Sequence, residues 1–375
     1  MYFPGKDLIC MEKFIEEVWS FFHEHPENAF QEKETAAFIA AKLRAFGYEV
    51  TENVGGTGVI GVLDSGVPGL ALGLRADMDC LVFNVDGKPT NYHGCGHDGN
   101  MSMLLAAARQ LAQDGIKQGK LYVIFQPAEE TLGGSPGLIA SGKLDGLDEI
   151  VGMHLQPAAE ELPGHASPRL MHKAYGNIEL TVHGRSAHAA MPHLGINATE
   201  AGVQIVNAVN CVRCDSRSPY SCKVTVFKAD GSSRNTIPDK AELSFDMRAD
   251  SNEVMEQLIS RVKTAAVNAA AAMGAQVEFT REVFCRAANY DDGLADVVKD
   301  ALAAVLGEDN VHDETSCTCS EDFHNYSGML GCKAAYVSLG ADFTPYLHAY
   351  DAMFDHAYMK KGAEVFIRTA HARLG

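Results

Sequence analysis

The alternation of helical and strand-like segments is the feature that most restricts the fold of this chain. Apolar residues recur at helical spacing in segments such as 12–25 and 32–46, and they form short continuous runs in others. These runs lie at 57–63, 70–74, 121–125 and 149–153. Runs of this kind are typical of strands that helices cover on both faces of a sheet. We therefore expect an α/β fold with a mostly parallel sheet over roughly the first 170 residues.

The pattern changes near His172. From residue 177 the expected elements follow in the order strand, helix, strand, strand, helix and strand. This βαββαβ order is typical of a small α+β, ferredoxin-like domain with an antiparallel sheet. Because 375 residues suffice for two cores, we predict that residues 173–283 are inserted into a first domain formed by 1–172 and 284–375.

Composition and charge exclude several classes of protein. The sequence is 46% hydrophobic and 21% charged, and it has no apolar run of the roughly 18 residues that a membrane-spanning helix needs. The formal net charge of −18 argues against nucleic acid or an anionic membrane as a partner, since both would repel the chain. Residues 1–11 lack the basic and apolar regions of a secretory signal, and the ten cysteines are scattered. We therefore expect a cytoplasmic location and reduced thiols.

Potential metal ligands are densest in residues 93–100, which read His-Gly-Cys-Gly-His-Asp-Gly-Asn. The thiol of Cys95 and the imidazole of His97 suit a transition-metal ion such as Zn²⁺, and the glycines allow the backbone to bend tightly around one. The segment could also be a glycine-rich turn that happens to carry polar residues. This motif alone does not decide between the two interpretations.

Further polar side chains follow the expected strands. They are Asp77, Asp79, Glu129, Glu130 and His154, and His348 lies far downstream. Because the chemistry of such sheets collects at the carboxyl ends of their strands, this set, with Cys95 and His97, fits two divalent ions with one acid left over. Adjacent Glu129 and Glu130 cannot point the same way, so one can bind metal while its neighbour accepts a proton from water. Metal-assisted hydrolysis requires such a division of labour.

Six motifs point to a known family. They are Leu-Arg-Ala-Asp-Met-Asp at 74–79, Cys-Gly-His-Asp at 95–98, Phe-Gln-Pro-Ala-Glu-Glu at 125–130, Gly-Met-His at 152–154, Gly-Arg-Ser-Ala-His-Ala-Ala at 184–190 and Asn-Thr-Ile-Pro at 235–238. In this order they resemble the aminoacylase/carboxypeptidase family of dinuclear metallo-amidohydrolases, and within it the branch of hippurate hydrolase and the indole-acetyl-amino-acid hydrolases. The resemblance implies a metallopeptidase-like catalytic domain in 1–172 and 284–375, with an inserted lid and dimerisation domain in 173–283.

The resemblance also assigns roles in the catalytic domain. The ligands that it implies for two divalent ions, Zn²⁺ or Mn²⁺, are Cys95, His97, Glu130, His154 and His348. Glu129 corresponds to the general base of the family. Asp79 corresponds to a carboxylate that orients a metal ligand without binding metal itself. Asp77 stands where other branches have a metal-binding histidine, and its role stays open.

Three residues of the inserted domain correspond to residues that contact the substrate. His188 corresponds to a histidine that reaches the active site of a partner subunit and stabilises the developing oxyanion. Asn235 and Arg248 correspond to residues that hold the free carboxylate of the substrate, a task for which a guanidinium has paired donors. Arg248 could instead close a strand end against Asp246 or Asp250. These correspondences imply a homodimer.

The implied reaction is hydrolysis of the amide bond of an N-acyl-amino acid. A dipeptidase or carboxypeptidase would use the same atoms, and a non-catalytic dimeric member would bind a metabolite without turnover. The sequence departs from the family pattern at Asn100, where many relatives have histidine, and at Ala349 and Tyr350, which replace the usual histidine or serine and proline. Cys317 and Cys319 stand where relatives seldom have cysteine. We expect the departures at Asn100, Ala349 and Tyr350 to affect the substrate rather than the chemistry, while the thiols of Cys317 and Cys319 could line the pocket or only pack.

Overall fold

The computed structural model describes residues 5–375, with side chains from Met11 onward. Part of the segment 1–11, on which the expectation of no secretory signal depends, therefore lies outside the described residues. The chain forms two compact units. Unit 1 contains the chain up to Met171 together with Asn289–Cys317 and Glu321–Gly375, and unit 2 contains His172–Ala288 and Thr318–Ser320. None of the described helices is long and apolar enough to cross a bilayer.

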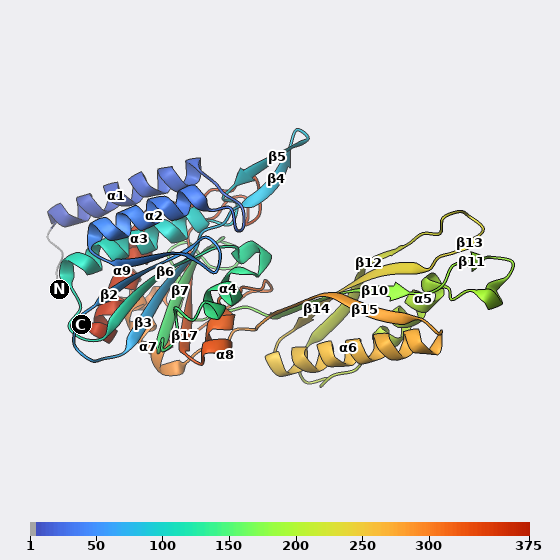
Figure 1. The fold of residues 1–375 in the computed structure, drawn as a ribbon. Coiled ribbons are helices and arrows are strands. Elements are labelled where there is room, and N and C mark those ends of the chain that lie inside the picture. Colours follow the sequence, from blue (N-terminus) through green and yellow to red (C-terminus); the bar gives the residue numbers. More distant parts are fainter. Residues whose placement is uncertain (1–4) are drawn as a thin grey trace. The chain divides into compact units, whose positions relative to one another are not determined.

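Unit 1 is built on a seven-stranded sheet with the strand order β1-β2-β6-β3-β7-β17-β8 (Figure 1). The strands are β1 (Glu49–Val54), β2 (Gly58–Asp64), β3 (Ala71–Asp77), β6 (Lys120–Gln126), β7 (Glu149–Gln156), β8 (Ala166–Ser167) and β17 (Lys333–Gly340). The four central strands run parallel, whereas β1, β2 and β8 pair antiparallel. The sheet is therefore mixed, and the expectation of a mostly parallel sheet describes only its centre. A short turn joins β1 to β2, and such a connection permits only antiparallel pairing.

Helices cover both faces of this sheet. One face packs with α1 (Gly5–Glu24), α2 (Lys33–Phe46), α3 (His97–Asp114), α7 (Asp292–Leu306) and α9 (Ala357–Leu374). The other face packs with α4 (Gly134–Ala140) and α8 (His324–Leu330). Val123 and Val151 belong to the first core, and their neighbours Ile124 and Ile150 belong to the second. The continuous apolar runs of the sequence are thus strands that are buried on both faces.

Two short strand pairs complete unit 1. They are the hairpin β4 (Leu81–Val85) and β5 (Lys88–Tyr92), and the pair β9 (Leu170–Met171) and β16 (Thr315–Ser316). The hairpin projects beyond the main sheet (Figure 1) and leads directly into the segment that contains Cys95. β3, β6 and β7 end at Asp77, Gln126 and Gln156, so the residues that follow β3 and β6 meet at one edge of the sheet.

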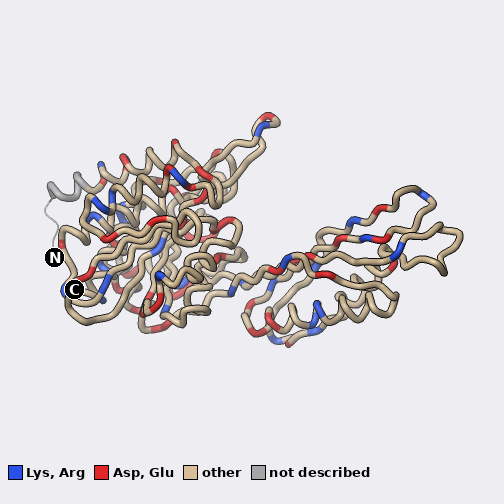
Figure 2. Tube along the Cα trace, viewed as in Figure 1, with Lys and Arg blue, Asp and Glu red and all other residues tan. Residues whose placement is uncertain are grey.

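Unit 2 has a four-stranded antiparallel sheet in the order β12-β14-β10-β15, and two helices pack on it. The elements are β10 (Ala174–His183), α5 (Ala198–Asn210), β12 (Tyr220–Ala229), β14 (Lys240–Ala249), α6 (Asn252–Ala272) and β15 (Gln276–Cys285). They follow along the chain in the βαββαβ order that the sequence predicts. The loops after β10 and β12 pair with each other through two short strands, β11 (Ala187–His188) and β13 (Thr236–Ile237). Charged residues of both signs are distributed over each unit (Figure 2).

Candidate metal centre and active site

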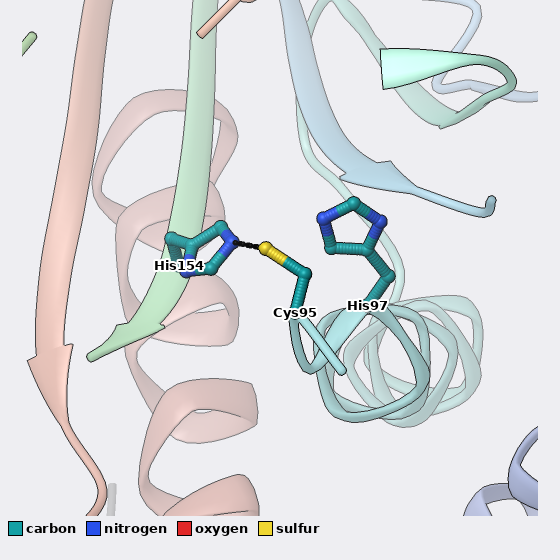
Figure 3. A group of neighbouring side chains, drawn as sticks. All are labelled: Cys95, His97 and His154. Atoms are coloured by element: carbon teal, nitrogen blue, oxygen red, sulfur yellow. Dashed lines mark hydrogen bonds between the residues drawn. The ribbon is translucent and has the colours of Figure 1, made fainter. Parts of the chain in front are cut away.

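All five residues that are expected to bind metal converge in unit 1. Ligand atoms of Cys95, His97 and His154 lie within 4.8 Å of one another, and so do those of Cys95, Glu130 and His348. Sγ of Cys95 is 3.5 Å from Nε2 of His154, and the His97 ring faces the same space (Figure 3). Cys95, His97 and His154 are buried, whereas the side chain of His348 is 56% exposed. The group is therefore open to solvent on the side of His348.

Local backbone geometry brings these ligands together. Gly96 has φ 81, and a Cβ atom built on it would lie 2.7 Å from the ring of Phe343, so this position between two ligands requires glycine. His97 then opens α3. His348 also has a positive φ of 62, and its backbone N–H donates to the carbonyl oxygen of Gly94 at 2.7 Å. That bond links the C-terminal ligand loop to the Cys95 segment.

Hydrogen bonds fix the orientation of two imidazoles in the candidate site. Nδ1 of His97 donates to the carbonyl oxygen of Asp79 at 2.8 Å, and Nδ1 of His154 donates to that of Leu155 at 2.7 Å. Each histidine therefore directs Nε2 into the cluster. Among the described residues, Nε2 of His97 and Oε1 of Glu130 are buried without a hydrogen-bond partner. Buried polar atoms of this kind need a partner, and a set of sulfur, nitrogen and carboxylate donors fits divalent transition metals.

Asp79 fixes the two adjacent glutamates. Its carboxylate accepts the backbone N–H of Glu129 at 2.9 Å and that of Glu130 at 3.0 Å. The two glutamates form a single 3-10 turn after β6, so their side chains leave the backbone in different directions. Glu130 joins the group with Cys95 and His348, while a carboxylate oxygen of Glu129 also lies within 4.8 Å of Glu321 and Asp322. Oxygens of both glutamates also lie within 4.8 Å of each other and of a ring nitrogen of His97, so the two carboxylates share one edge of the cluster and differ in their other neighbours.

Burial and crowding change the protonation of the site. Burial raises the pKa of Glu129 well above its usual value, and nearby carboxylates, first that of Glu321, raise it further. Burial also raises the pKa of Glu130 to about 7, although His97 opposes the shift. Burial lowers the pKa of His97, but carboxylates, first that of Asp77, outweigh it and raise the value to about 10. Without a cation the cluster therefore holds protons, and binding of metal would release them.

Sequence reasoning missed a charged network beside this cluster. The guanidinium of Arg75 is fully buried, and its nitrogens lie 2.7 Å from Asp77, 3.0 Å from Glu321 and 3.2 Å from Asp322. Asp77, whose role the sequence left open, also accepts a hydrogen bond from Asn100 at 3.0 Å and lies 3.8 Å from Nε2 of His97. Arg75 and Asp77 are two positions apart on β3, so their side chains point to the same face of the sheet, and this spacing in the sequence could have predicted their ion pair. The partners of Arg75 in the C-terminal part of the chain are not visible in the sequence.

Unit 2 carries the remaining candidate residues at two separate places. Nδ2 of Asn235 lies 3.3 Å from Nε2 of His188, and both side chains are exposed beside the β11–β13 pair. Arg248 pairs with Asp246 at 3.2 Å and stacks over Tyr175 at the other end of the β10–β14 register. The contact with Asp246 was expected as the alternative to substrate binding, whereas Asp250 pairs with Lys173. Within one chain the structure therefore does not bring Arg248 together with Asn235.

Comparison with known proteins identifies the family. A model of the peptidase family M20/M25/M40 matches residues 73–372. The chain belongs to this family. The resemblance that the six motifs predict is thereby confirmed, and the chain is an M20 amidohydrolase related to N-acyl-amino-acid hydrolases.

Individual members of the M20 family resemble the chain over most of its length. The hippurate hydrolase of Campylobacter jejuni is 29% identical over 97% of both chains. The N-acetyl-L-cysteine deacetylase of Bacillus subtilis is 32% identical over 90% of this chain and 83% of its own. Among solved structures, a dinuclear metal-binding peptidase of the M20 family from Bacillus subtilis has a TM-score of 0.77 and 25% identity, over 97% of this chain and 99% of that one.

Proposed function

We propose that this M20 protein hydrolyses N-acyl-amino acids with the aid of two divalent cations. The ligands would be Cys95, His97, Glu130, His154 and His348. The observation that carries the proposal is that these donors converge in overlapping groups, while the carboxylate of Glu129 lies beside the ligand cluster next to Glu321 and Asp322. When bound, the ions would polarise the amide carbonyl and lower the pKa of a water molecule. The thiolate favours Zn²⁺, and the carboxylate and imidazoles also accept Mn²⁺.

Glu129 would act as the general base. It would take a proton from the attacking water and later deliver it to the nitrogen of the leaving amino acid. The backbone bonds to Asp79 hold the glutamate pair in place for this transfer.

Residues of unit 2 would complete the site by exchange between two subunits. His188 and Asn235 are adjacent and exposed, which fits a pair that reaches the site of a partner subunit to stabilise the oxyanion and hold the substrate carboxylate. Arg248 lies at the opposite end of the same strands, where the chain enters and leaves unit 2. We therefore propose that Arg248 of one subunit and Asn235 of the other bind the free carboxylate of the substrate. Residues 173–283 would form the inserted lid.

The exposed edge of the unit 2 sheet supports a homodimer. β12 is an edge strand, and Val224, Val226 and Phe227 on it are exposed. An uncovered strand edge with apolar side chains favours pairing with another strand. A second copy of this chain, joined through β12, would cover the edge.

A substrate panel tests the proposed reaction. The metal-free protein, reloaded with Zn²⁺ or Mn²⁺, is given N-acetyl- and N-benzoyl-amino acids and the matching dipeptides. We expect release of free amino acid from the acylated compounds, and a loss of at least about 100-fold in kcat for Glu129→Gln with metal content unchanged. Faster cleavage of the dipeptides would favour a dipeptidase. Binding of acyl-amino acids without hydrolysis under either metal would refute catalysis and leave a metabolite-binding member of the family.

A further inference from the structure

Three aromatic rings form a cluster beside the exposed metal ligand. They come from Phe83 on β4, Tyr92 on β5 and Tyr350 in the loop after His348. The centroids of Phe83 and Tyr350 are 5.8 Å apart, those of Tyr92 and Tyr350 are 5.3 Å apart, and those of Phe83 and Tyr92 are 6.4 Å apart. All three distances lie in the range of attractive aromatic pairs. We call these three residues the aromatic cluster.

The cluster is attached to the segment that carries the ligands. A Cβ atom on Gly94, the residue before Cys95, would lie 2.8 Å from the ring of Phe83 and 2.8 Å from the carbonyl oxygen of Ala349. The same glycine accepts the backbone N–H of His348. Tyr350 is two residues beyond His348, so their Cα atoms are within about 7 Å of each other. A substrate bound near His348 is therefore within reach of the cluster.

The cluster is fixed on one side and open on the other. The hydroxyl of Tyr92 donates to the carbonyl oxygen of Ala352 at 3.0 Å, and its ring packs edge to face against His23. Tyr350 is 42% exposed, although it is part of the ring cluster. A large aromatic side chain that is held by two other rings and still open to solvent offers a preformed apolar surface. The imidazole of His348, two residues before Tyr350, is also exposed.

We propose that Tyr350, supported by Phe83 and Tyr92, is a specificity residue that binds a planar aromatic acyl group. This inference rests on the proposed hydrolysis of N-acyl-amino acids. A benzoyl-type group would pack against the exposed ring of Tyr350, whereas an acetyl group is too small to cover it. Tyr350 lies in the segment where the sequence departs from the family pattern, so the preference would be a property of this chain.

The test compares two substrates that differ only in the acyl group, N-benzoylglycine and N-acetylglycine. For Tyr350→Ala we expect the ratio of kcat/KM for benzoyl over acetyl to fall about tenfold, mainly through KM for the benzoyl substrate. Tyr350→Phe keeps the ring and should keep the ratio. The matched control is Tyr346→Ala, because Tyr346 is equally exposed in the same loop but its hydroxyl bonds to Glu160.

A binding measurement separates this inference from the proposed reaction. Calorimetric binding of N-benzoylglycine to metal-loaded Glu129→Gln should weaken about tenfold when Tyr350→Ala is added. Absence of hydrolysis by the natural protein would sink the proposed reaction, and the binding result would still decide the role of Tyr350. An unchanged ratio and unchanged binding for Tyr350→Ala, or an equal loss for both substrates, would overturn the inference and leave the cluster as a support for the loop.

Discussion

Replacement of Arg75 by methionine tests the charged network beside the candidate metal centre. Arg75→Met keeps the length and apolar volume of the side chain and removes the charge. Three buried carboxylates, Asp77, Glu321 and Asp322, then lose the cation that lies 2.7 to 3.2 Å from them. Loss of one partner from a buried ion pair costs about 3–5 kcal/mol of unfolding free energy. That loss is a large part of the total of about 5–15 kcal/mol for a typical domain.

The loss should depend on pH. Burial raises the pKa of Asp322 to about 7 in the intact protein, although Arg75 opposes the shift, and removal of Arg75 would raise it further. A carboxyl group with a raised pKa binds more protons in the folded state than in the unfolded state, so its contribution to stability falls as pH rises. We therefore expect Arg75→Met to be less destabilising at pH 5.5 than at pH 8.

Urea unfolding of the metal-free protein, followed at both pH values, measures this effect. The control is Arg44→Met, which removes a partly exposed pair with Glu52 and should cost no more than about 1 kcal/mol. If Arg75→Met costs as little as the control, or costs the same at both pH values, the network does not stabilise the fold through charge.

Three further predictions concern the metal centre. Asp79→Asn replaces one acceptor oxygen facing the N–H groups of Glu129 and Glu130, so metal affinity in a competition titration should fall about 10–100-fold; unchanged affinity would show that Asp79 does not position the pair. Gly96→Ala places a methyl group against Phe343 at positive φ, so it should cost at least about 1–2 kcal/mol in urea unfolding, whereas the exposed Gly66→Ala, also at positive φ but with open space, should cost less. Metal affinity should rise from pH 5.5 to 8, because Glu130, with a pKa of about 7, must release its proton to bind a cation; a flat profile by calorimetry would contradict this.

The sequence predicts the fold best where a pattern of apolar residues is compatible with only one kind of secondary structure. Buried runs such as 121–125 and 149–153 are strands, because apolar residues in succession fit a sheet that is covered on both faces. The antiparallel strands at the sheet edges were not predicted. The run at 57–63 has the same composition as a central strand, and only the short turn from β1 decides its direction.

The candidate ligands could be proposed from the sequence because they follow strands or surround glycines. Glu321 and Asp322 could not, since nothing local distinguishes them from solvated acids at a loop. Their importance comes from Arg75, which lies more than 200 positions earlier and reaches them only in the folded chain. The places of Arg248 and Asn235 at different ends of the unit 2 sheet are not visible in the sequence for a related reason. A motif gives the residue type at a position, and the strand register decides which residues share one end of a sheet.

Charge balance predicts that divalent cations and protons would compete at the candidate site. The buried acids around the cluster are Asp77, Asp79, Glu129, Glu321, Asp322 and, at its border, Glu130. Arg75 is the one buried arginine paired with them in the described chain, so a single guanidinium cannot neutralise the set. Burial is the main cause that raises the pKa of Glu129, Glu130 and Asp322 in the metal-free protein, and the neighbouring carboxylates raise the three values further. Two divalent cations would supply the missing positive charge. In their absence, the acids with raised pKa values include both the proposed ligand Glu130 and the proposed base Glu129.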